Sequence, residues 1–277
     1  MLCNKKNFLL IILFTFCCAQ NSQATNIIFA LDELLFTVDK KTLNDILGHE
    51  NISTKLGFWW YGGYTSKAAL VKDIMDKLKS IPNSAIHCQE HQAYYTGQKV
   101  APILCEWVLG FRPSKEIQSI IINHLHAQTT LDPWVKTKFL EMAYIGLDPE
   151  KLMHVVQLVP EGIALLKKCY ETRRHNLYIL SNCPAEIFDR LVYKHSDIFA
   201  LFNGAAISSK IHLIKPHSAI YNYLLTTYQL NPYDCLYIGT TPDGLITAQQ
   251  LGMKTILWDP YNYAPGLAIL TEMGILD

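Results

Sequence analysis

The spacing of apolar residues divides the chain into two parts. Between residues 45 and 147, apolar positions recur every three or four residues, which is the period of an amphipathic helix. The pattern is clearest in three stretches: Ser66–Ser80, Ser114–Gln128 and Val135–Leu147. We therefore predict that this part of the chain is helical.

From Pro160 onward, short apolar runs alternate with amphipathic stretches. The runs that read as strands are Asn176–Ser181, Ala205–Ser208, Cys235–Gly239 and Thr255–Trp258. The helices expected between them are Glu161–Thr172, Pro184–His195, His217–Tyr228 and Asp243–Leu251. With the earlier apolar run at Ile27–Asp32, this alternation predicts an α/β fold with a doubly wound parallel sheet. The expected organisation is an α/β core of residues 25–44 and 148–277, with a helical domain of residues 45–147 inserted into it.

Composition narrows the class of protein. The chain has 277 residues, 50% of them hydrophobic, and its formal net charge is zero. This length can bury a sizeable core with one insertion. A neutral chain without long basic runs gives no electrostatic argument for binding nucleic acid.

The first 24 residues have the pattern of an export signal. Lys5 and Lys6 precede an apolar block at Phe8–Ala19, and Ser22–Ala24 supplies small residues for cleavage. The block is shorter than the ~20 residues that span a membrane. We expect cleavage after Ala24 and a soluble protein that is secreted or periplasmic, with an uncleaved anchor as the alternative.

Cleavage would leave five of the eight cysteines, an odd number. Export permits disulfides. Cys88 and Cys105 lie close in sequence and are the favoured pair, whereas Cys169 and Cys235 read as small core residues. At least one thiol is expected to stay free.

Polar side chains gather where the predicted strands end. Asp32 follows the first strand, Ser181 and Asn182 end the second, and Lys215 lies on a loop leading into a helix. Because parallel strands present their carboxyl ends at one edge, these side chains are expected to lie together. A hydroxyl, an amide and an ammonium suit a phosphate or carboxylate ligand.

In order and spacing, these segments resemble the haloacid dehalogenase-like (HAD) superfamily, most of whose members are phosphohydrolases. The matching segments are Ile27–Asp32, "YILSN" ending at Asn182, "KIHLIKPHSAIYNYLL" with Lys215, and "CLYIGTTPDGLITAQQLGMKTILW" from Cys235 to Trp258. The resemblance implies a Rossmann-type core, and it makes the helical insertion a cap domain over the site. It also implies that Ser181, Asn182 and Lys215 contact phosphate.

The same resemblance exposes departures from the family pattern. Family members carry two aspartates at the end of the first strand, one as nucleophile and one as general acid/base. Asp32 matches the second position and Ala30 stands at the first; in the alternative register Leu34 would replace the acid. Gly239 and Thr240 stand where the family has acids that hold magnesium. The expected cofactor, Mg²⁺, therefore lacks its carboxylate ligands here, and we predict no cofactor and no metal site.

These departures predict a protein that is catalytically inactive or strongly impaired but keeps an anion pocket. A methyl group cannot attack phosphorus. Phosphoryl transfer also needs a metal ion to offset the negative charges of the nucleophile and the phosphate. Asp32 would orient the anion or pair with Lys215, and the ligand would be a small phosphorylated or anionic molecule. One alternative is a weak hydrolase that uses Asp32 as general acid/base. Another is a protein-interaction role through the cap, and a third is that Ser181 and Lys215 only stabilise their turns.

Three other groups favour ordinary structural roles. His87 and His91 have the spacing of a metal pair but lack a convincing third ligand, so solvated histidines are favoured. Cys183 follows the second strand but has no base beside it, which favours an inert thiol. The aromatic run Phe58–Tyr61 suits packing of the cap, with a ligand wall or partner surface as the alternative.

Overall fold

The computed structural model describes residues 25–39, 41–42, 67–81, 94–95, 98–259 and 261–276. The predicted export signal, the Phe58–Tyr61 run and the His87–His91 segment with Cys88 lie outside these residues.

A five-stranded parallel sheet forms the centre of the described part of the chain. Its strand order is β7-β6-β1-β8-β9, and β1 (Asn26–Phe29) pairs with both β6 (Asn176–Ser181) and β8 (Cys235–Gly239). The outer strands are β7 (Gly204–Ile207) and β9 (Lys254–Leu257). The predicted doubly wound parallel sheet is confirmed.

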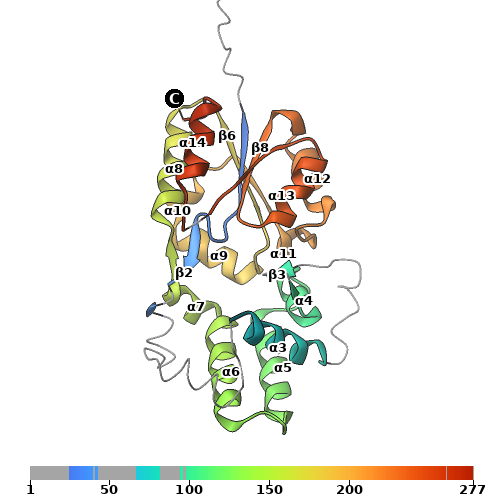
Figure 1. Cartoon of the computed structure of the whole chain (residues 1–277). Coiled ribbons are helices and arrows are strands. Elements are labelled where there is room, and N and C mark those ends of the chain that lie inside the picture. Colours follow the sequence, from blue (N-terminus) through green and yellow to red (C-terminus); the bar gives the residue numbers. More distant parts are fainter. Residues whose placement is uncertain are drawn as a thin grey trace, which may run out of the picture.

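Helices cover both faces of this sheet (Figure 1). On one face, a single apolar cluster includes residues of α8 (Pro160–Glu171), α9 (Ala185–Lys194), α10 (Ser196–Phe199) and α14 (Ala264–Glu272). On the other, a second cluster includes residues of α12 (Ser218–Thr227) and α13 (Pro242–Gln250). Because both faces are covered, the central strands are largely apolar: in β1, Ile27, Ile28 and Phe29 are completely buried.

The helical insertion, which we define as α3 to α7, lies beyond one end of the sheet (Figure 1). Its elements are α3 (Lys67–Lys79), β3 (Tyr94–Tyr95), β4 (Gln98–Lys99), α4 (Pro102–Val108), α5 (Ser114–Ala127), α6 (Pro133–Gly146) and α7 (Pro149–Val155). It has its own apolar cluster, in which Ile117, Ile121 and Phe139 are buried. At its base, β2 (Phe36–Val38) pairs antiparallel with β5 (Val156–Leu158).

Local sequence explains where two of these helices begin. Asp132 caps α6 by accepting hydrogen bonds from the backbone N–H groups of Trp134 and Val135, and Asp148 caps α7 in the same way. A proline follows each aspartate at the first helical position, where its missing N–H costs nothing. This Asp-Pro signal was not used in the prediction, which started the α6 helix two residues late.

The strands Asn176–Ser181 and Cys235–Gly239 agree with prediction residue for residue, and β7 and β9 each start one residue earlier than predicted. The elements that were not predicted are short or terminal: α4, α7, α10, α11 (Ser208–Ile211), η1 (Pro232–Asp234), α14 and the β2–β5 and β3–β4 pairs. Among the described residues, no helix is both long and apolar enough to span a membrane.

Candidate functional site

Three neighbouring strands bring the predicted site residues to one edge of the sheet. In the strand register, Phe29 of β1 lies beside Ile179 of β6 and Ile238 of β8. The residues that follow these positions are therefore neighbours: Ala30 and Asp32 after β1, Ser181 at the end of β6, and Gly239 at the end of β8.

The two residues after β1 have different environments. Ala30 is buried, and its backbone N–H donates to the carbonyl of Ile238 at 3.0 Å. Asp32 has an exposed surface, and its backbone carbonyl accepts a hydrogen bond from the Thr240 hydroxyl at 3.2 Å. Glu33 has φ of 56°, in the left-handed region that glycine adopts most easily, and its carboxylate accepts a hydrogen bond from Thr37.

Asn182 holds the backbone of Lys215 in place. The Asn182 Nδ2 donates to the Lys215 carbonyl at 3.0 Å, and the Lys215 N–H donates to Asn182 Oδ1 at 2.8 Å. Because both polar atoms of the amide are used in this pair, Asn182 acts here as a positioning residue for the lysine. The Ser181 side chain is buried, and its hydroxyl has no hydrogen-bond partner among the described residues.

The side-chain partner of Lys215 is a tyrosine. Lys215 Nζ lies 3.3 Å from the Tyr237 hydroxyl and 5.8 Å from the centre of its ring. The structure describes both Lys215 and Asp32, and it shows no ion pair between them. The expected pairing of Asp32 with Lys215 is therefore limited to attraction at longer range.

Gly239 makes room for the Tyr237 ring. A Cβ atom at position 239 would lie 2.8 to 3.0 Å from the ring and hydroxyl of Tyr237, closer than real contacts allow. At Gly244, a Cβ would lie 3.2 Å from the hydroxyl of Tyr221. Tyr221 packs edge-on against Tyr237 and donates to the Gly244 carbonyl at 2.9 Å. Two tyrosine rings thus occupy the space next to two glycines.

Burial raises the pKa of the Asp32 carboxyl above its ordinary value. The positive charge of Lys215 lowers this pKa and the negative charge of Glu33 raises it, but the effect of burial is the largest. The residue keeps an exposed surface, so water screens part of this effect. A carboxyl with a raised pKa takes up a proton more readily, which suits a general acid more than a fixed negative charge.

The Cys183 thiol is an unsuitable nucleophile. Burial raises its pKa to about 12, and the nearby Asp32 adds to this effect. The thiolate is the reactive form, so this thiol stays protonated and inert at neutral pH. Cys169 and Cys235 are also free and buried, in agreement with their predicted core roles.

The residues at the sheet edge do not fit a magnesium ion. Mg²⁺ prefers octahedral oxygen ligands, commonly with one or two carboxylates. At the strand ends, Asp32 offers a carboxylate, whereas Ala30 offers a methyl group and Thr240 a hydroxyl. The next acid along the chain after β8, Asp243, is exposed on the first turn of α13. Within the described residues, no group of three or more acidic, histidine or cysteine side chains could hold a metal ion.

Polar contacts attach the helical insertion to the core. The buried Ser208 hydroxyl donates to the Val108 carbonyl at 2.7 Å and accepts from the Cys183 N–H at 3.0 Å. The His212 ring contacts the Leu109 carbonyl through Nδ1 at 2.7 Å and stacks on Phe111. These contacts set the end of α4 and the loop that follows against the segment after β7.

A family model for haloacid dehalogenase-like hydrolases matches residues 113–258, more than half of the chain. The chain belongs to the haloacid dehalogenase-like hydrolase family. The matched residues include Ser181, Asn182, Lys215 and Tyr237. A search of curated proteins gave no significant match.

Solved structures of HAD proteins share the fold at low sequence identity. A HAD family enzyme from Bacteroides thetaiotaomicron aligns with a TM-score of 0.54 at 13% identity, over 89% of this chain and 98% of that chain. A variant of that enzyme with an aspartate changed to alanine, in complex with magnesium and inorganic phosphate, gives 0.55 at 16% identity, over 89% and 99%. A HAD-like family hydrolase from Porphyromonas gingivalis gives 0.53 at 16%, over 90% and 98%.

The predicted residues Asp32, Ser181, Asn182 and Lys215 lie near one edge of the sheet, and sequence reasoning missed Tyr237, the side-chain partner of Lys215. The strand "CLYIG" reads as uniformly buried, and nothing in it separates Tyr237 from a core residue. The available signal was the alternation of side chains along a strand, which places positions 237 and 239 on the same side.

Proposed function

We propose that this chain is a HAD-family protein that binds a small phosphorylated or other anionic molecule without a metal and lacks phosphatase activity. The observation that carries the proposal is the environment of Lys215. Its backbone is held by Asn182 and its ammonium meets a neutral phenol, so the positive charge is not cancelled by a paired carboxylate.

The unpartnered hydroxyl of Ser181 supplies a further donor at the same edge. Hydrogen bonds from charged donors to phosphate are stronger than neutral ones. The Bacteroides enzyme supports an anion as ligand, because its aspartate-to-alanine variant is in complex with magnesium and inorganic phosphate; binding without the metal is the proposal for the present chain. In the present chain Ala30 leaves no oxygen for nucleophilic attack, and Gly239 and Thr240 remove the carboxylates that would hold Mg²⁺.

Two further proposals complete this function. The helical insertion acts as a cap that limits which anions reach the sheet edge, with the contacts of Ser208 and His212 holding it there. Residues 1–24 act as an export signal, so that the mature protein is secreted or periplasmic. N-terminal sequencing of the protein from its own host tests the second point, and a start at Met1 would refute it.

Calorimetric titration with inorganic phosphate tests metal-free anion binding. We expect the same affinity in EDTA and in Mg²⁺, and at least a tenfold loss in Lys215→Met. The matched control is Lys210→Met, which removes an equal charge from an exposed lysine paired with Asp189. Binding that requires Mg²⁺, or that both lysine variants weaken equally, would refute the proposal.

A second candidate function is weak hydrolysis with Asp32 as general acid/base, and the raised pKa of Asp32 is the observation that favours it. General acid/base catalysis contributes about 10²- to 10⁴-fold. Hydrolysis of p-nitrophenyl phosphate by the wild-type protein, abolished in Asp32→Ala, would establish this second function in place of the first.

The double variant Ala30→Asp, Thr240→Asp is the positive control for the assay. It restores acids at two of the family positions, and we expect it to gain Mg²⁺-dependent hydrolysis while the wild type stays inert. A double variant that is folded, binds phosphate and stays inert would show that more than these acids separates the site from an active one.

A further inference from the structure

The helical insertion contains a half-open cavity of about 250 Å³ that is distinct from the sheet edge. Among the described residues, helices form its walls: α3 contributes Leu78, α4 contributes Trp107, α5 contributes Ile121 and α6 contributes Ala143. The lining is almost wholly apolar, and Leu78, Ile121 and Ala143 are buried from solvent.

The size and lining of this cavity are typical of a site for a small apolar ligand. Ligand pockets are concave and lined mostly by hydrophobic and aromatic side chains, with a few polar groups that orient the ligand. For scale, an engineered apolar cavity of ~150 Å³ binds benzene. Water in the cavity would find few polar partners along this lining, so an apolar guest that displaces it gains free energy.

The α6 wall is shaped to leave this space open. Gly146 and Ala143 stand one turn apart on the cavity side of α6. A Cβ atom at Gly146 would meet no atom within 4 Å. Glycine is unfavourable within a helix, and no steric contact requires it here.

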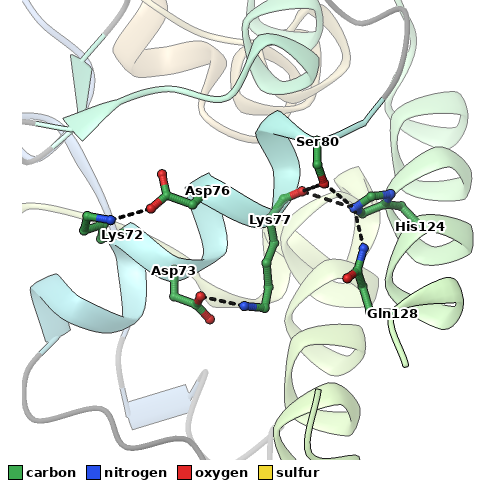
Figure 2. A network of polar contacts seen from close by, with 7 residues as sticks. All are labelled: Lys72, Asp73, Asp76, Lys77, Ser80, His124 and Gln128. Carbon is green, nitrogen blue, oxygen red and sulfur yellow. Dashed lines mark hydrogen bonds and ion pairs between the residues drawn. The ribbon is translucent and has the colours of Figure 1, made fainter. Parts of the chain in front are cut away.

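Of the described residues that line the cavity, one, Lys77, is charged. Lys77 lies along α3 and pairs with Asp73 at 2.5 Å, as Figure 2 shows. Both side chains are partly exposed, so this ion pair contributes little to stability. A lysine ammonium has three N–H donors, which leaves donors for a second carboxylate.

The helix that carries Lys77 is attached to α5. Figure 2 shows the His124 Nε2 of α5 within 3.1 Å of both the Lys77 carbonyl and the Ser80 hydroxyl. Gln128 contacts the same nitrogen at 3.0 Å. These contacts hold the C-terminal turn of α3 against α5 and so keep the α3 wall in place.

We propose that this cavity binds a medium-chain fatty acid, with the alkyl chain among the helices and the carboxylate beside Lys77. The cavity, at about 250 Å³, is larger than the ~150 Å³ that holds the six carbons of benzene, so a chain of about eight carbons is a suitable size. Octanoate is therefore the natural probe. The inference is independent of the function proposed for the sheet edge, and inorganic phosphate does not compete for this site.

Calorimetric titration of the purified chain with octanoate and with octanol tests the proposal. We expect one octanoate per chain, binding at least tenfold more tightly than octanol, and a rise in melting temperature. Ala143→Leu fills the cavity and should weaken octanoate at least tenfold, whereas Ser119→Leu adds the same bulk on the exposed side of α5 and should change nothing. Lys77→Met should lower the affinity for octanoate to the affinity for octanol.

Three results would overturn the proposal. The first is no binding of octanoate at millimolar concentration to protein that circular dichroism shows to be folded. The second is octanoate affinity that survives Ala143→Leu, which would place the ligand elsewhere on the surface. The third is equal affinity of the wild type for octanoate and octanol, which would remove the role of Lys77.

Discussion

The Tyr237 hydroxyl, 3.3 Å from Lys215 Nζ, is the side-chain partner of the lysine at the sheet edge. A phenol is neutral at physiological pH, so it orients the ammonium without cancelling its charge. The ring reaches this position because residue 239, two places along the same strand, is glycine. Gly239 and the tyrosine partner of Lys215 are therefore parts of one local arrangement.

The steric dependence of Tyr237 on Gly239 gives the first prediction. Gly239→Ala places a Cβ atom against the Tyr237 ring and should lower the free energy of unfolding by about 1–3 kcal/mol, as overpacking typically does. In a Tyr237→Leu background the same change should cost much less, because the ring is gone. Urea denaturation of the four proteins gives the coupling energy. Additive effects would mean that the ring is not the obstacle.

The control for that experiment is itself a prediction. Gly146→Ala adds a Cβ atom that meets nothing within 4 Å. The change should raise the free energy of unfolding by about 0.4–1 kcal/mol, because alanine loses less conformational freedom on folding. A lower stability would show that the space beside Gly146 is filled.

Asn182 should affect both stability and anion binding. Asn182→Ala removes two hydrogen bonds to the Lys215 backbone, and we expect a loss of about 1–3 kcal/mol. Phosphate affinity should fall as well, because the lysine is no longer held toward the ligand. Titration of the folded variant at low temperature measures the second effect. Unchanged affinity would mean that Lys215 is positioned by other contacts.

Asp32 should make stability depend on pH. Its pKa is higher in the folded than in the unfolded chain, so at neutral pH the ionised carboxyl is disfavoured in the fold. Asp32→Asn should therefore be more stable than the wild type at pH 7. The difference should shrink as pH falls through the folded pKa toward 3.8, because the folded chain takes up its proton first.

Asp39 provides a control of opposite sign for this pH dependence. Its pKa is lowered, chiefly by a hydrogen bond from Thr42, so its ionised form stabilises the fold. Asp39→Asn should be less stable than the wild type at pH 7, with the difference lost as pH falls from about 3.8 through the lowered pKa. Thermal unfolding across this pH range measures both variants, and matching pH profiles would contradict the assignment.

Two adjacent serines test the attachment of the helical insertion. Ser208→Ala leaves the Val108 carbonyl and the Cys183 N–H without their partner and should cost about 1–3 kcal/mol. The neighbouring Ser209 hydroxyl is buried without a hydrogen bond, so Ser209→Ala should be neutral or stabilising. Chemical denaturation compares the two, and equal losses would mean that the Ser208 contacts contribute nothing specific.

The sequence by itself determined the elements of the core and the residues at its edge. The strands of β6 and β8 could be located to the residue because central parallel strands are buried on both faces and must be continuously apolar. Asp32 and Ser181 could be selected as candidates because polar residues at the ends of such runs are exceptions to the pattern, and Lys215 because it lies on a loop leading into a helix. The identities of Ala30, Gly239 and Thr240 are also read directly from the sequence, and the absence of acids there stays a prediction about activity.

Only the tertiary structure decided how those residues interact. Asn182 turned out to hold a backbone that is 33 residues away in sequence, and Lys215 turned out to meet Tyr237, which no local pattern marks as polar. The half-open cavity in the helical insertion lies between α3, α4, α5 and α6, so its lining depends on how these helices pack. Hydrophobic periodicity determines which face of an element is buried, but partner and packing depend on contacts between residues far apart in the chain.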